Sequence, residues 1–81
     1  MKEYIATFYS HFGAVRFRKM LKGQGRKAKI MPVPRNLSSS CGSCVLFEMD
    51  APPLEDKYNE IEQIVEVLEK EYRCVYRASN S

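Results

Sequence analysis

Four short runs along the chain have the pattern of strands, and the first of them, residues 3–9, is rich in the aromatic and β-branched residues typical of strands. Glycines, prolines or serines separate the first three of these runs from their neighbours, as turns and helix ends require. The pattern therefore predicts four strands, which cover residues 3–9, 27–33, 44–49 and 72–77.

Two further stretches have the periodicity of amphipathic helices. Residues 11–23 gather apolar side chains on one face, with Ser10 as a good N-cap and Gly23 and Gly25 as stop signals. Residues 54–71 follow a proline-containing turn and have the clearest helical pattern, with an acidic, solvated face opposite an apolar stripe. That stripe consists of Leu54, Tyr58, Ile61, Ile64, Val65 and Leu68.

The predicted order is βαββαβ, whose commonest solution is the ferredoxin-like fold, an α+β fold with an antiparallel four-stranded sheet and two helices on one face. We expect residues 1–77 to form this single domain and residues 78–81 to be a frayed tail. In this topology the first strand ends at the sheet edge where the second and third strands are joined. Ser10 and His11, at the start of the first helix, should therefore lie beside that connecting loop. The end of the second helix and the start of the last strand should reach the same edge.

A sheet with both helices on one face leaves its other face open. By alternation we expect Met31, Val33, Leu46 and Val75 on that open face, which would suit a homodimer or another protein partner. We expect Cys74, in the last strand, to be a buried small apolar residue.

The segment from Pro32 to Cys44 carries the candidate chemistry, because it brings two cysteines, a glycine and three serines into one loop. A cysteine becomes reactive when a helix N-terminus, a cation or a CxxC partner stabilises its thiolate. Three sources of stabilisation could converge on Cys41, namely the positive N-terminus of the first helix, the guanidinium groups of Arg35 and Arg16, and His11 as base or cationic partner. The candidate catalytic residues are Cys41, His11 and Arg35. The loop amides could form a nest for an anion, and the candidate binding residues are Ser38, Ser39, Ser40, Gly42 and Cys44.

Other interpretations of the same loop stay open. A serine-rich run ending in Cys-Gly is also typical of a flexible turn, and a small interaction domain without chemistry would look the same. Cys41 and Cys44 also suit a thiol redox or soft-metal module. A second CxxC motif, which would complete a four-cysteine zinc site, is absent from the sequence, and we predict neither a resident metal nor a cofactor.

Charge and composition limit the classes of partner that we expect for this protein. A net charge of +3 on 81 residues is a mild basic excess that does not indicate nucleic acid. The βαββαβ order is also that of an RNA-recognition module, but residues 44–49 lack the basic and glycine-rich pattern of its third strand. The residues after Met1 do not resemble a secretory signal, and no run approaches the roughly 18 apolar residues of a membrane span. We therefore expect a cytoplasmic protein with reduced thiols and no nucleic-acid or membrane partner.

The motif Pro-x-Pro-Arg-x-Leu-Ser-Ser-x-Cys-Gly, over residues 32–42, resembles the signature of the putative selenium/sulfur carrier protein-like family. The resemblance covers nearly the whole chain and includes the Ser10-His11 pair. It implies a small bacterial carrier that bears sulfur or selenium on Cys41 and exchanges it with donor and acceptor proteins, rather than a classical enzyme. Similar sequences also occur attached to YedF-type selenium-metabolism proteins. Cys44 departs from the family pattern, and would act as a resolving thiol or simply face the sheet.

Overall fold

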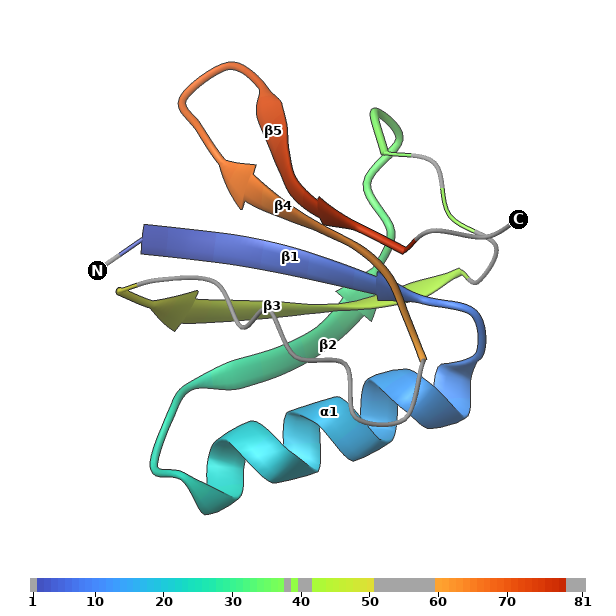
Figure 1. Cartoon of the computed structure of the whole chain (residues 1–81), viewed down its shortest axis with the longest axis vertical. Helices are drawn as coiled ribbons and strands as arrows, with labels where there is room; N and C mark the ends of the chain where they lie inside the picture. The colour runs from blue at the N-terminus through green and yellow to red at the C-terminus, as the bar shows by residue number, and fades with distance from the viewer. Residues whose placement is uncertain (1, 38, 40–41, 51–59, 79–81) are drawn as a thin grey trace.

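A curled antiparallel sheet with one helix beneath it makes up the described part of the chain (Figure 1). The computed structural model describes residues 2–37, 39, 42–50 and 60–78. Within these residues the sheet has five strands in the order β2-β3-β1-β4-β5, and every neighbouring pair is antiparallel. The elements are β1 (Lys2–Phe8), α1 (His11–Gly23), β2 (Ala28–Pro32), β3 (Ser43–Met49), β4 (Ile61–Val67) and β5 (Tyr72–Arg77).

The prediction of a ferredoxin-like fold is wrong, although the fold is α+β. The described residues contain one helix and five strands, where the sequence pattern predicts two helices and four strands. The difference lies in Ile61–Val67, which belongs to the predicted helix over 54–71 but forms β4. The earlier part of that predicted helix lies outside the described residues.

A β-bulge explains why β4 has the apolar spacing of a helix. Two successive residues of β1 pair with Gln63 and then with Ile61, so Glu62 is an extra residue in β4. The bulge puts Ile61 and Ile64 into the same apolar cluster, although a regular strand would point residues three apart to opposite faces. The resulting spacing of buried residues imitates one face of a helix.

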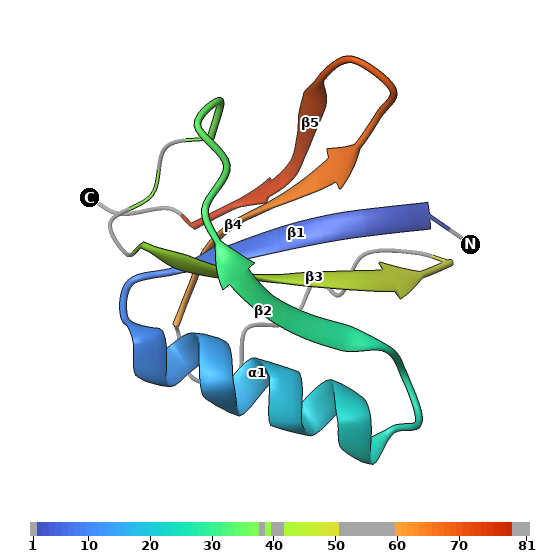
Figure 2. The same ribbon diagram turned by 180° about the vertical axis from the view of Figure 1, so that it is seen from behind.

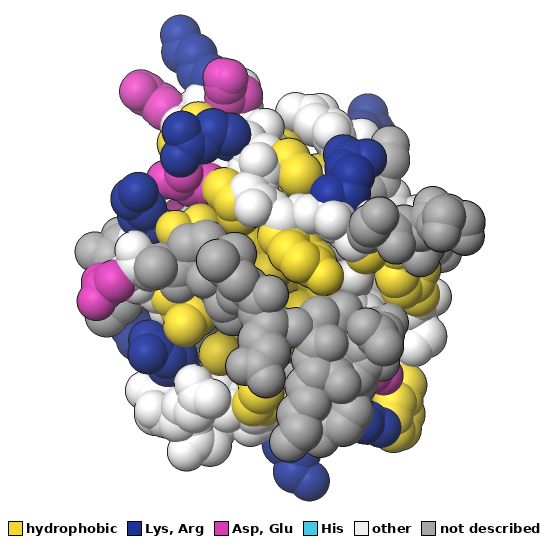
Figure 3. All heavy atoms as spheres, in the orientation of Figure 1, with side chains coloured by type: hydrophobic (Ala, Val, Ile, Leu, Met, Phe, Trp, Pro, Cys, Tyr) yellow, Lys and Arg dark blue, Asp and Glu magenta, His cyan; other side chains and the backbone are white. Residues whose placement is uncertain are grey.

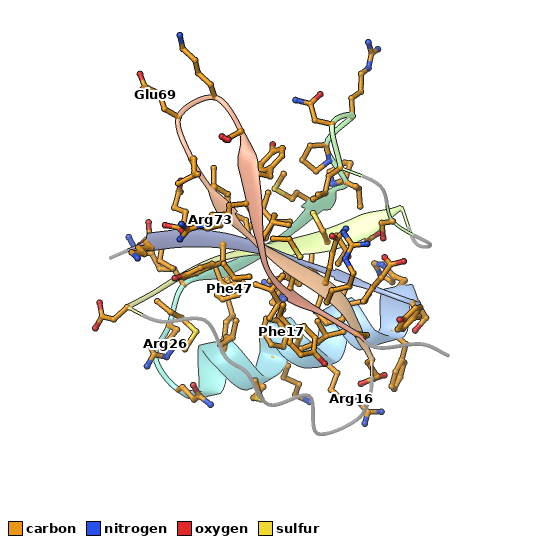
Figure 4. The ribbon with its side chains drawn as sticks, turned by 45° about the horizontal axis from the view of Figure 1, so that its top comes forward. Arg16, Phe17, Arg26, Phe47, Glu69 and Arg73 are labelled. Carbon is orange, nitrogen blue, oxygen red and sulfur yellow. The ribbon has the colours of Figure 1, made fainter. Side chains whose placement is uncertain are left out.

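The main core lies between the sheet and α1, and it fixes where the helix begins. Phe17 of α1 packs between Phe8 and Phe47, with ring centroids 5.3 Å from each. Figure 4 shows Phe17 and Phe47 next to one another. The predicted N-cap is confirmed, because the hydroxyl of Ser10 accepts a hydrogen bond from the Gly13 amide at 3.3 Å. Capping and aromatic packing together hold the first turn of α1 at one end of the sheet.

The opposite face of the sheet carries a second, smaller apolar cluster. Ile5, Cys44 and Val65 are at most 2% exposed there, and Leu37 and Tyr72 pack against them. Figures 1 and 2 both show the β2–β3 loop and the β4–β5 hairpin standing on this side, away from α1. The chain therefore covers the centre of this face with its own residues.

The predicted open face agrees only partly with the structure. Met31, Val33 and Leu46 belong to the second cluster and are half-buried against it. Val75 packs against the helix-side core instead, and Cys74 is exposed, so the prediction of a buried Cys74 is wrong. A homodimer through this face stays a prediction.

Candidate functional site

The start of α1 and the start of β3 meet at one end of the sheet (Figure 2). Because β1 and β3 are antiparallel with Thr7 opposite Cys44, the helix that follows β1 begins beside the residues that open β3. The Nδ1 atom of His11 lies 3.1 Å from the hydroxyl oxygen of Ser43. The prediction that the first helix starts next to the cysteine loop is thus confirmed.

The prediction that the end of a second helix and the start of the last strand reach this end of the sheet is wrong. Phe8, at the end of β1, pairs with Ile61, so β4 begins here. β5 ends here, because Arg77 pairs with Gln63 and the Ala78 amide donates to the Glu62 carbonyl at 3.0 Å. Replacing the predicted second helix by β4 reverses the direction of the last strand relative to that prediction.

Two hydrogen bonds anchor the described part of the β2–β3 loop. The Val33 amide donates to the Gly42 carbonyl at 3.0 Å, which closes the base of the loop. The Ser39 hydroxyl donates to the Glu62 carboxylate at 2.8 Å, which joins the loop to β4. The loop is therefore tied both to its own strands and to a strand distant in sequence.

Glu62 is the residue that the sequence analysis missed. Its Oε1 atom accepts hydrogen bonds from Ser39 and, at 3.1 Å, from the hydroxyl of Thr7, which is fully buried in β1. Bulges of this kind re-aim a side chain and are common next to active sites. The sequence pattern places Glu62 on the solvated face of a helix. The β-branched residues of β4 were the available signal against that placement.

Cys44 lies inside the second apolar cluster. Its side chain is fully buried, and its thiol donates to the Pro32 carbonyl at an Sγ–O distance of 3.7 Å. Burial raises the pKa of the Cys44 thiol from 9.0 to about 11, because the low-polarity surroundings disfavour the thiolate. Cys44 is therefore a protonated core thiol at neutral pH.

The other predicted site residues fall into two groups. His11, Arg35 and Gly42 are exposed, on the first turn of α1 and on the loop. The remaining three, Ser38, Ser40 and Cys41, lie outside the described residues.

Two kinds of feature are absent from the part of the chain that the structure describes. There, no three His, Cys, Asp or Glu side chains are grouped so that they could hold a metal ion. No helix in the same residues combines the length and hydrophobicity that crossing a membrane requires.

Known proteins resemble this chain over almost its whole length. The uncharacterized protein YtiA of Escherichia coli strain K12 is 31% identical over 74 residues, which cover 91% of this chain and 80% of YtiA. No solved structure matches the chain. The family model described as "Putative Se/S carrier protein-like" matches residues 3–77, which confirms the resemblance seen in the sequence. The chain therefore belongs to the Putative Se/S carrier protein-like family.

Proposed function

We propose that this protein carries a sulfur or selenium atom on Cys41. The family description supports a carrier of these two elements. In the sequence, Cys41 is two residues from Ser39 and two residues from Ser43. Ser39 donates a hydrogen bond to the Glu62 carboxylate, and Ser43 lies beside His11. This pair of anchors, one on β4 and one on α1, is the observation that carries the proposal.

Loading of the carrier is a thiol exchange. The Cys41 thiolate attacks the outer sulfur of a donor persulfide, R–S–SH. A new S–S bond forms on Cys41, the S–S bond of the donor breaks, and the donor leaves as the thiolate R–S⁻. A donor of the form R–S–SeH transfers selenium by the same steps, and an acceptor thiolate unloads the carrier by reversing them.

His11 is the proton acceptor in this proposal. It is exposed at the N-terminus of α1, where the partial positive charge of the helix favours an anion such as a thiolate. A neutral imidazole has a ring nitrogen that can take the proton of an attacking thiol. Arg35, which is exposed on the β2–β3 loop, supplies further positive charge.

The burial of Cys44 favours a carrier with one reactive thiol over a module that uses two. A thiol with a pKa of about 11 is a thiolate in only roughly one molecule in ten thousand at pH 7. A redox or soft-metal site that needs Cys44 as a thiolate would therefore have to open the second apolar cluster.

Mass spectrometry after incubation with a cysteine desulfurase and free cysteine tests the proposal. We expect a mass increase of one sulfur atom on Cys41 in the wild-type protein and in Cys44→Ala, and none in Cys41→Ser. An unmodified Cys41, or sulfur spread equally over the three cysteines, would contradict it. Normal function of Cys41→Ser in cells would instead favour an interaction domain without chemistry.

The proton-accepting role of His11 has a separate test. His11→Asn keeps a polar group near Ser43 but cannot titrate. We expect the pH dependence of the Cys41 alkylation rate to differ between this variant and the wild-type protein, because the asparagine side chain cannot take up the proton of the thiol. An identical pH profile in the two proteins would remove His11 from the mechanism.

A further inference from the structure

A cavity of about 340 Å³ lies between the β2–β3 loop and the β4–β5 hairpin, on the sheet face opposite α1. Leu37 of the loop and Val65 and Tyr72 of the hairpin contribute apolar walls. In Figure 3, which views this region from the side of Figure 1, charged side chains surround the turn of the hairpin, and apolar atoms reach the surface between the hairpin and the loop. The volume falls within the range of small-molecule sites in proteins.

A second β-bulge brings a thiol and a guanidinium group to this cavity. Val65 pairs with Cys74 and Gln63 pairs with Arg77, so residues two apart in β4 face residues three apart in β5. The extra residue of β5 is taken up by the bulge. Cys74 and Arg77 therefore both line the cavity, where a regular strand would turn them to opposite faces.

Both groups are positioned by contacts and reachable from solvent. The Arg77 guanidinium donates to the side-chain oxygen of Gln63, at an Nη2–Oε1 distance of 3.5 Å. The Cys74 thiol donates to the Tyr76 carbonyl at 3.4 Å. Cys74 and Arg77 are exposed, so a molecule in the cavity can touch both.

The charged residues around the cavity are Arg77, Lys70 and Glu71, which amount to two cations and one carboxylate. This balance favours a ligand with at least one carboxylate and tolerates an ammonium group. The apolar walls suit a short methylene stem. A carboxylate, a short stem and a sulfur atom are the parts of a small amino-acid or peptide thiol.

We propose that this cavity binds the disulfides of small thiol compounds that carry a carboxylate, and that such a disulfide exchanges one of its sulfur atoms with Cys74. Arg77 pairs with the carboxylate, and the stem lies along Leu37 and Tyr72. With a disulfide R–S–S–R, the Cys74 thiolate attacks one sulfur, a Cys74–S–S–R bond forms, and R–S⁻ leaves and takes up a proton. The proposal uses another cysteine, Cys74, and a small molecule, so it goes beyond the carrier function proposed for Cys41.

Thiol exchange with three disulfides of different charge tests the site. The Cys41→Ser protein is treated with glutathione disulfide, neutral hydroxyethyl disulfide or cationic cystamine, and peptide mass spectrometry follows the mixed disulfide on Cys74. Each rate is divided by the rate for the same chain in denaturant, which removes the intrinsic reactivity of the reagent. We expect the folded protein to prefer glutathione disulfide over cystamine.

The preference should depend on Arg77 in particular. Arg77→Gln should lower it roughly two- to fivefold, the effect expected of one exposed ion pair. Arg26→Gln makes the same charge change at an exposed residue that does not line the cavity, and it should leave the preference unchanged. Equal normalised rates for the three disulfides, or equal losses in both variants, would overturn the proposal. Because Cys41 is replaced throughout, the outcome does not depend on the carrier function.

Discussion

Cys44 and Cys74, the cysteines within the described residues, show how far the environment of one residue type can differ inside a small domain. Cys44 is enclosed by apolar side chains, whereas Cys74 is exposed beside a cavity. The spacing of Cys41 and Cys44 indicates a reactive pair, and only the register of β3 against its neighbours shows that Cys44 points into the core. A residue pattern names the chemistry that is available, but burial decides the protonation state in which it is available.

The raised pKa of Cys44 predicts a loss of stability at high pH. An unfolded thiol releases its proton near 9.0, but the folded thiol keeps its proton until about 11, so the stabilising contribution is complete below pH 9 and is lost as the pH rises toward 11. Between roughly pH 8 and pH 10.5 the wild-type protein should lose about 2 kcal/mol more free energy of unfolding than Cys44→Ala. Urea unfolding of both proteins at the two pH values measures this difference. The same pH dependence in both would show that Cys44 titrates normally.

At the scale of elements, local signals predicted α1 well and β4 wrongly. The serine cap, the apolar face and the closing glycines of α1 lie within the helix itself, so the sequence was sufficient. The buried residues of β4 have the spacing of a helix because Glu62 is an extra residue that bulges out of the pairing with β1. The bulge also aims the Glu62 carboxylate at Ser39, so the same irregularity that misled the prediction anchors the candidate site.

Substitutions that remove the hydrogen bond between Ser39 and Glu62 should loosen the β2–β3 loop locally. Glu62→Ala should lower the free energy of unfolding by about 1–2 kcal/mol, because it removes the acceptor of two hydroxyl groups. Ser39→Ala should speed hydrogen exchange of the Val33 amide, which closes the loop. Amide exchange measured by NMR reports this change.

Two variants serve as controls for the anchor. Thr7→Val removes the other hydroxyl on the same carboxylate oxygen, so it should cost stability without speeding exchange at Val33. Glu62→Gln keeps an acceptor and should largely restore slow exchange. If Thr7→Val and Ser39→Ala loosen the loop equally, the carboxylate is a general stabiliser and not an anchor of the loop.

At the scale of the whole molecule, the sheet brings together segments far apart in sequence. The candidate site takes His11 from α1, Ser39 and Ser43 from the loop and start of β3, and Glu62 from β4. The adjacency of α1 and the loop was predictable, because antiparallel β1 and β3 place the end of one strand beside the start of the other. The contribution of β4 was not predictable from a pattern that assigns this segment to a helix.

Two substitutions distinguish the observed strand from the helix that the pattern predicts. In a helix, Ile64 and Leu68 would share one apolar face and lose similar stability on truncation. In the structure Ile64 is fully buried, whereas Leu68 lies beyond β4 and is 37% exposed. Ile64→Ala should therefore cost about 2–4 kcal/mol and Leu68→Ala less than about 0.5 kcal/mol, measured by urea unfolding. Similar losses for the two variants would argue for the helix.

The sequence by itself determined the family, four of the five strands and the helix of the described residues, and the motif that carries the candidate chemistry. Each of these depends on residues that are near one another in the chain. The tertiary structure alone decided that Ile61–Val67 is a strand, that Cys44 is buried and that Glu62 holds the loop. Those outcomes depend on strand pairing and register, which are set by contacts between distant segments and can override local propensity.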